Sequence, residues 1–247
     1  VKGALKKGEF EVWFQPQYDY ETSALIGAEA LVRWRHPERG LIPPADFIPL
    51  LERSRQVTFV DTYVIEKSCA YAKYWQERGI ELSISVNISR IDILGGKICR
   101  TISDTVKKLG IEPRLIKLEI TESAYTSDTE ALKSVVTDFK AAGFTVEMDD
   151  FGSGYSSLNI LKDLDIDTIK IDIKLTSQVG CGNKKSDDIL RSVVKMAKDL
   201  NIGVIAEGVE TKTQAEFLKA VGCTAMQGYY FARPMPPQEF ERLVGKD

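Results

Sequence analysis

The sequence predicts one α/β domain folded as a TIM-like (β/α)8 barrel with an irregular antiparallel first strand. Eight short apolar runs alternate with stretches of helical periodicity along the 247 residues, which is the length and rhythm of that fold. Glycines follow several of the helical stretches, as C-terminal helix caps do. Only a short stretch around TSAL separates the first two apolar runs, so we expect these two to form an antiparallel hairpin.

The expected strands follow one another at regular intervals. In chain order they are EVWFQPQY (11–18), ALIGAEAL (24–31), LSISVNI (82–88), LIKLEIT (115–121), FTVEMDD (144–150), TIKID (168–172), GVIAEG (203–208) and TAMQG (224–228). Apolar residues spaced for a helix face lie between them, at Leu132, Val135, Val136 and Phe139, and at Leu190, Val193, Val194 and Ala197. Ser127–Glu130 and Thr211–Gln214 have the form of capping boxes, and the expected C-cap glycines are Gly79, Gly110, Gly143 and Gly222.

Composition indicates a globular chain, with 43% hydrophobic and 28% charged residues. It has no run of about 18 apolar residues, so we expect a cytoplasmic domain without membrane contact, although the full-length protein could be tethered to a membrane. The net charge of −3 offers no basic field for duplex nucleic acid. Because VKGALKKGEF resembles a helix cut from something longer, we expect residues 1–247 to be one domain of a larger protein.

Cysteine and histidine usage restricts the metal chemistry. The four cysteines make no CxxC spacing and are expected to be reduced thiols, with Cys181 the most exposed. His36 is the single histidine, so neither a histidine pair for acid–base work nor a histidine-rich metal cage is available. A metal here would have carboxylate and amide ligands, which favours Mg²⁺ or Mn²⁺ over Zn²⁺.

Polar residues stand at or near the carboxyl end of each apolar run. They are Gln15, Glu29, Asn87, Glu119, Asp149 with Asp150, Lys170 with Asp172, Glu207 and Gln227. A barrel gathers these strand ends onto one face, where barrel enzymes keep their chemistry. Strand alternation further predicts that Lys117, Glu119 and Thr121 share a face, as do Glu147 with Asp149 and Lys170 with Asp172.

Each of these positions also has a purely structural interpretation. A lone glutamate can be a solvated rim residue, Lys170 can simply pair with Asp172, Asn87 can cap the next helix, and Gly-Ser-Gly can be only a tight turn. Together, however, so many carboxylates in one mouth would repel one another unless a positive charge lay among them. We therefore expect two cations. Glu29, Asn87, Glu119 and Asp149 would hold the first, and Asp149 with the adjacent Asp150 would hold the second.

Two oxygen-ligated divalent cations beside a lysine suit hydrolysis of a phosphodiester. Lys170 is the expected partner of the attacking water or of a non-bridging oxygen, and Glu207 is a candidate base or a further metal ligand. A Mg²⁺-dependent barrel lyase of the enolase type would use many of the same residue types. The residue pattern alone leaves both reactions open.

Seven segments carry a family resemblance. They are GAEALVRWRHPERGLIPPADFIPLLE, SVNIS, LEITES, MDDFGSGYSSL, DTIKID, VIAEGVET and GCTAMQGYYFARP. In this order they resemble the motifs of the EAL-domain cyclic-di-GMP phosphodiesterases. The resemblance implies a barrel enzyme that cuts cyclic di-GMP to linear pGpG with two Mg²⁺ or Mn²⁺ ions. Its implied metal ligands are Glu29, Asn87, Glu119, Asp149 and Asp150, and its implied catalytic residues are Lys170 and Glu207.

The resemblance also implies substrate contacts and partners. Arg33 matches an arginine that contacts the substrate phosphate, Gln227 lines the nucleotide pocket, and Gln15 and Asp172 are further substrate candidates. The DDFGSGYSSL segment would form a mobile loop that Glu122 anchors and that is tied to homodimerisation. A GGDEF or sensor domain is expected in the full-length protein. Some members of the family are catalytically silent receptors or interaction modules, and that alternative remains.

Overall fold

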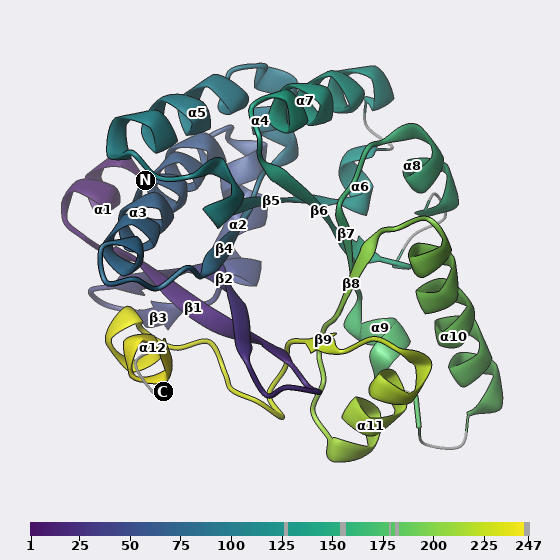
Figure 1. The fold of residues 1–247 in the computed structure, drawn as a ribbon. Helices are drawn as coiled ribbons and strands as arrows, with labels where there is room; N and C mark the ends of the chain where they lie inside the picture. Colours follow the sequence, from purple (N-terminus) through teal and green to yellow (C-terminus); the bar gives the residue numbers. More distant parts are fainter. Residues whose placement is uncertain (126–127, 154–156, 178, 181–182, 245–247) are drawn as a thin grey trace.

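Eight strands close into a barrel in the computed structural model, which describes residues 1–125, 128–153, 157–177, 179, 180 and 183–244 (Figure 1). They are β1 (Phe10–Asp19), β2 (Leu25–His36), β4 (Ser83–Asn87), β5 (Ile116–Thr121), β6 (Thr145–Phe151), β7 (Thr168–Ile171), β8 (Gly203–Ala206) and β9 (Ala225–Met226). The order around the barrel is β1-β9-β8-β7-β6-β5-β4-β2, and a ladder between β1 and β2 completes the circle. The predicted barrel is confirmed.

Strand β1 runs against both of its neighbours. It pairs with β2 from Phe10↔Trp34 to Gln17↔Gly27, and with β9 at Tyr18↔Met226. The other ladders of the barrel are parallel, so the predicted antiparallel hairpin at the start is correct. The sequence did not predict β3 (Gly40–Ile42), which extends β2 beyond the barrel. Three residues beside a glycine are too short to show strand periodicity.

The helices surround the barrel, and most of them connect successive parallel strands. They are α1 (Lys2–Lys6), α2 (Pro44–Arg53), α3 (Val57–Gln76), α4 (Arg90–Gly95), α5 (Ile98–Leu109), α6 (Glu122–Tyr125), α7 (Thr129–Ala141), α8 (Ser157–Asp163), α9 (Ile173–Thr176), α10 (Lys184–Asp199), α11 (Lys212–Val221) and α12 (Pro237–Val244). Among the described residues, no helix is both long and apolar enough to cross a bilayer.

Helix ends follow the capping signals in the sequence. Thr211 and Gln214 form the predicted capping box at α11, and Gly222 ends that helix in the left-handed conformation. At α7 the cap is Asp128, whose side chain accepts a hydrogen bond from the amide of Ala131 at 3.0 Å. Ser127, the residue expected to cap this helix, lies outside the described residues.

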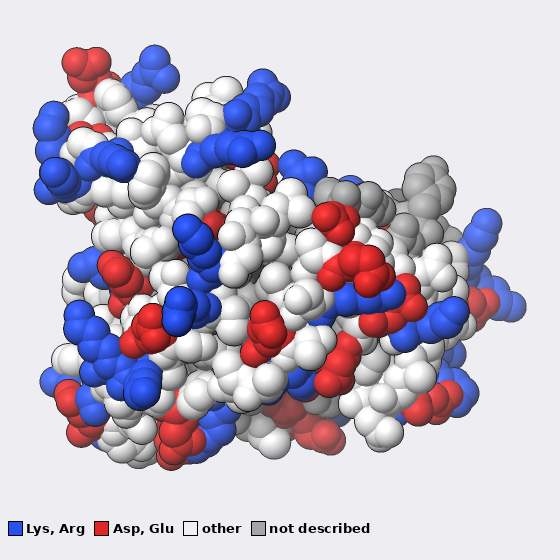
Figure 2. All heavy atoms as spheres, turned by 90° about the horizontal axis from the view of Figure 1, so that it is seen from above, with Lys and Arg blue, Asp and Glu red and all other residues white. Residues whose placement is uncertain are grey.

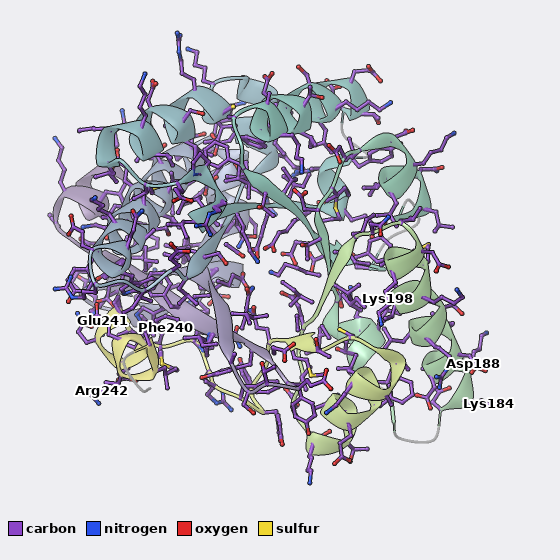
Figure 3. The ribbon with its side chains drawn as sticks, viewed as in Figure 1. Lys184, Asp188, Lys198, Phe240, Glu241 and Arg242 are labelled. Atoms are coloured by element: carbon purple, nitrogen blue, oxygen red, sulfur yellow. The ribbon has the colours of Figure 1, made fainter. Side chains whose placement is uncertain are left out.

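The main core lies between the barrel and its helices. Phe14 of β1 is buried against Trp75 of α3 and Phe240 of α12, with ring centroids 5.3 and 5.4 Å apart, and Figure 3 labels Phe240 on that helix. Burying an aromatic side chain of this size contributes about 1.5–3 kcal/mol. The C-terminal helix therefore covers the outer face of the reversed strand. On the face that carries α5 and α7, basic and acidic side chains are interspersed (Figure 2).

The inside of the barrel is polar, whereas barrels of this class are usually filled with branched apolar side chains. Strand alternation directs a set of buried polar side chains inward. It comprises Gln15, Gln17, Glu29, Ser85, Glu119, Glu147, Lys170 and Gln227. Cys69 and Cys223 are buried free thiols and Cys99 is half-buried, while Cys181 lies outside the described residues.

Candidate active site

The ammonium group of Lys170 is the centre of the charged cluster at the carboxyl ends of the strands. Its Nζ lies 2.7 Å from Glu119 Oε1 and 2.7 Å from Glu207 Oε1. It lies 3.3 Å from Glu29 Oε2 and 3.4 Å from Asp149 Oδ1. The lysine is fully buried. The structure therefore brings together acidic residues from β2, β5 and β6 and from the end of β8 around one cation on β7.

Burial and mutual repulsion perturb the ionisation of this cluster. Burial raises the pKa of Glu207 to about 8, and the charges of Asp149 and Glu29 add to the rise. The pKa of Glu119 is also raised, first by burial and then by the charge of Glu29. Burial alone would lower the pKa of Lys170, but its acidic neighbours raise it well above its usual value. Lys170 therefore stays charged, while Glu207 can hold a proton near neutral pH.

Amide side chains fix the carboxylate of Glu29 from two sides. Asn87 Nδ2 donates to Glu29 Oε1 at 3.2 Å, and Gln227 Nε2 donates to Glu29 Oε2 at 2.5 Å. Gln227 Nε2 also donates to Gln15 Oε1 at 3.1 Å. The alternative in which Asn87 caps the next helix is wrong, because Ser89 is the N-cap of α4.

A β-bulge explains how two adjacent aspartates reach the same mouth. The β6–β7 register shifts between Met148 and Phe151, and Asp150 has a φ of +56°. In a regular strand neighbouring side chains point to opposite faces, whereas a bulge redirects one of them. Burial and then the charges of Asp149 and Asp172 raise the pKa of Asp150 to about 6.

Asp172 and Glu122 support the backbone at the rim of the site. Asp172 caps α9, since its Oδ1 accepts from the amide of Lys174 at 2.6 Å. Glu122, which is buried, accepts a hydrogen bond from the amide of Gly152 at 3.3 Å. That contact joins α6 to the start of the segment after β6. Residues 154–156 of the expected mobile loop lie outside the described residues.

Arg33 lies farther along β2 than Glu29, on the same face. Its guanidinium donates to the carbonyl of Val32 at 2.9 Å and lies 5.6 Å from the centroid of the Trp13 ring. Burial lowers the pKa of this arginine, and the charge of Glu29 partly offsets the effect. Arg33 is therefore a half-buried cation near the acidic cluster, and it forms no ion pair with any of the described residues.

Two cavities meet at Glu29. One, of about 380 Å³, is lined by residues that include Gln15, Asp149, Glu207 and Gln227. The other, of about 610 Å³, extends between α2, α3 and the end of β4, past Asn87 and Ser89. Asp61 of α3 also lines this second cavity.

Asp61 is a candidate that the sequence analysis did not identify. Its Oδ2 is buried without a hydrogen bond. Burial and then contact with Asp92 raise its pKa well above the usual value. The signal was present in the sequence, since Asp61 is an acid on the otherwise apolar face formed by Val57, Val60 and Val64. A buried polar atom without a hydrogen bond at a cavity wall is available to contact a ligand.

The donor chemistry of the cluster fits hard divalent cations. Both carboxylate oxygens of Glu119 and Oδ1 of Asp149 are buried without a hydrogen bond, and their contacts with Lys170 are ion pairs. Oxygen ligands of this kind suit Mg²⁺ and Mn²⁺. Yet no group of three or more His, Cys, Asp or Glu side chains in the described ranges is already arranged to hold an ion. Lys170 occupies the space among these acids.

Comparison with known proteins gives a consistent result. The family model of the EAL domain matches residues 1–234. The signalling protein YkoW of Bacillus subtilis is 33% identical over 244 residues, which are 99% of this chain and 30% of that protein. The bifunctional diguanylate cyclase/cyclic di-GMP phosphodiesterase MucR of Pseudomonas aeruginosa is 33% identical over 242 residues, which are 97% of this chain and 35% of that protein.

A solved structure agrees with these relatives. The PaMucR phosphodiesterase in its c-di-GMP complex has a TM-score of 0.91 and 32% identity, and the match covers 97% of each chain. The chain thus spans only about a third of the length of these two curated relatives. It corresponds to almost the whole of the solved one.

Proposed function

This chain belongs to the EAL domain family, and on that premise we propose that it is a metal-dependent phosphodiesterase that hydrolyses cyclic di-GMP to linear pGpG. The observation that carries the proposal is the charge cluster. Four carboxylates from separate strands lie within 3.4 Å of one buried lysine, in a mouth flanked by two cavities. Relatives described as cyclic di-GMP phosphodiesterases support the choice of substrate.

Glu29, Asn87, Glu119 and Asp149 are the proposed ligands of a first cation, and Asp149 and Asp150 those of a second. When bound, two such cations would lower the pKa of a water and neutralise charge on the phosphoryl oxygens. The ammonium of Lys170 can donate to a non-bridging oxygen of the scissile phosphate. In its ionised form Glu207, whose Oε1 lies 2.7 Å from Lys170 Nζ, can accept the proton that the attacking water loses.

The two cavities suit the repeated halves of a cyclic dinucleotide. Each borders Glu29, so a scissile phosphate at the cluster would leave room for a base on either side. In the larger cavity, the unpartnered Oδ2 of Asp61 could accept hydrogen bonds from the N–H groups of a guanine. Gln15, Arg33, Asp172 and Gln227 are the other proposed substrate contacts. Arg33 is suited to phosphate because a guanidinium binds it in a bidentate manner.

The proposal is tested by incubating the purified chain with cyclic di-GMP in Mg²⁺, Mn²⁺ or EDTA and separating the products by chromatography. Metal-dependent release of pGpG is the expected result. Glu29→Gln should abolish it, because the change removes one charged ligand and keeps the shape of the side chain. Glu216→Gln on the exposed face of α11 is the matched control and should retain turnover. An unchanged rate in Glu29→Gln would contradict the assignment of Glu29.

A catalytically silent receptor is the alternative function. The specific observation that favours it is the 2.7 Å contact between Lys170 and Glu119, because a proposed metal ligand already has a cationic partner there. Binding calorimetry separates the two functions. A receptor would bind cyclic di-GMP in EDTA and leave it intact when either metal is added, whereas the proposed enzyme would convert it.

We also propose that the chain acts as one domain of a longer, homodimeric signalling protein. The two relatives that are about three times its length support the proposal that it is one domain of a longer protein. Glu122 and its bond to Gly152 would couple the loop after β6 to the site. Light scattering on the purified domain, with and without cyclic di-GMP, measures the oligomeric state directly.

A further inference from the structure

A second buried ion pair lies inside the barrel, one layer below the Lys170 cluster. Glu147 is fully buried, and its Oε1 accepts a hydrogen bond from Lys117 Nζ at 3.0 Å. Its Oε2 accepts one from Ser85 Oγ at 2.6 Å. The side chain of Lys117 keeps a fifth of its exposure, at the amino end of the barrel. This group of Lys117, Glu147 and Ser85 is called the lower triad below.

The register of the sheet places Glu147 next to the catalytic acids. Glu147 on β6 is the direct partner of Glu119 on β5, and both side chains point into the barrel. Like charges directly across neighbouring strands destabilise a sheet. The charge of Glu147 contributes to the raised pKa of Glu119, which agrees with this proximity.

Strand order also brings Glu147 close to Lys170. Strand β6 lies between β5 and β7, and Glu147 pairs with Thr168, two residues before Lys170 on the same face of β7. Two inward carboxylates therefore compete for cations within the same part of the barrel. In the structure each has its own lysine, because Glu119 pairs with Lys170 and Glu147 pairs with Lys117.

Stability alone does not explain why the lower triad is charged. A buried ion pair is often no more stabilising than apolar side chains of the same volume. Apolar residues would fill this layer as they do in other barrels. A buried glutamate that lost its lysine, however, would turn to the nearest remaining cation, since an unpaired buried charge is costly. Among the residues that the structure describes, the fully buried cation inside the barrel is Lys170.

We propose that Lys117 is a positioning residue for the catalytic cluster. By holding Glu147 at the amino end of the barrel, together with Ser85, it keeps Lys170 free to pair with Glu119 and Glu207. The kinetic consequence rests on the proposed function, whereas the geometric one does not depend on it.

The decisive variant is Lys117→Met, which removes the charge and keeps an unbranched side chain. In a metal-free crystal structure of this variant, the carboxylate of Glu147 should lie within about 4 Å of Lys170 Nζ, the ion-pair distance. In the hydrolysis assay kcat should fall by about 10–100-fold, as is typical when a residue behind the metal ligands is lost. KM should change little, because the substrate cavities lie at the other end of the barrel.

Rescue separates positioning from general damage to the fold. The double variant Lys117→Met/Glu147→Gln removes the competing charge and should regain most of kcat, and Lys117→Arg should retain it. Lys140→Met is the matched control. It breaks the partly exposed ion pair between α7 and Asp167, the residue before β7, and should leave kcat unchanged. If Lys117→Met does not fold, Lys117→Gln replaces it with the same readouts.

Two results would overturn the proposal: Glu147 staying beside Ser85 in the Lys117→Met structure, or a double variant as slow as the single one. If the wild-type chain does not hydrolyse cyclic di-GMP, the proposed function fails. The metal-free structure then decides the positioning role by itself.

Discussion

Removing the charge of Lys170 should destabilise the metal-free protein strongly and in a pH-dependent way. Lys170→Met leaves four carboxylates facing one another, and all four lie within 3.4 Å of the lost ammonium group. Removing one partner of a buried ion pair costs about 3–5 kcal/mol. A domain of this size has only about 5–15 kcal/mol of stability. At 2–4 °C per kcal/mol, the melting temperature should fall by roughly 6–20 °C.

The loss should be larger at pH 8.5 than at pH 6. Burial already raises the pKa of Glu207 to about 8, so at pH 6 this carboxyl is protonated and adds no repulsion when the lysine is gone. At pH 8.5 it is ionised, and the variant then either carries the extra charge or binds a proton at a cost of about 1.4 kcal/mol per pKa unit. Added Mn²⁺ should stabilise the variant more than the wild type, because the cation replaces the missing charge.

The assay is urea unfolding followed by circular dichroism, in EDTA at both pH values and then in Mn²⁺. Lys140→Met is again the control, and its partly exposed pair should cost no more than about 1 kcal/mol at either pH. Equal unfolding free energies for Lys170→Met and wild type at pH 8.5 in EDTA would refute the reasoning. The acids would then not depend on Lys170 for neutralisation.

Three further outcomes are expected. Because the pKa of Glu207 is raised, its contribution to stability is complete below pH 4.5, its usual pKa, and is lost as the pH rises through about 8. Glu207→Gln should therefore reduce the fall of the metal-free unfolding free energy with pH in this range. An unchanged pH dependence would mean that another group causes it. Glu122→Ala should lower kcat without weakening metal affinity in calorimetry, because this residue holds the amide of Gly152 at 3.3 Å and has no proposed metal contact. Gly228→Ala should lower the unfolding free energy measured in urea by about 3 kcal/mol, because a Cβ there would lie 2.1 Å from the carbonyl oxygen of Val209. If the variant were as stable as the wild type, the backbone at this turn would have moved to make room.

The parts of the fold that depend on local pattern could be predicted from the sequence. The period of two in KLEIT and VEMDD correctly placed Lys117 with Glu119, and Glu147 with Asp149, on the inner face, because side-chain direction in a strand is a local property. The hairpin of β1 and β2 was predictable from the short connection between them.

The missed features depend on non-local geometry. The pairing of Lys117 with Glu147 is set by the β5–β6 register, which the sequence does not show. Asp61 lies in the second turn of α3, far in the chain from any strand end, and reaches the cavity only because that helix packs beside β4. The bulge at Asp150 was equally hidden, since it appears only as a register shift against β7.

The reversed direction of β1 places the start of that strand at the mouth end of the barrel. Since β1 is antiparallel to β2, its first residue, Phe10, pairs with Trp34, five residues beyond Glu29 at the mouth end. In a barrel whose strands are all parallel, the chain would enter at the opposite, closed end. Helix α1 precedes this strand and lies against α3, where Lys2 Nζ is 4.3 Å from the centroid of the Phe59 ring. A displacement of β1 would act on the β1–β2 ladder, in which Gln15 is the direct partner of Glu29. Because Phe240 of α12 packs on Phe14 of β1, the strand that borders Glu29 is held from outside by α12.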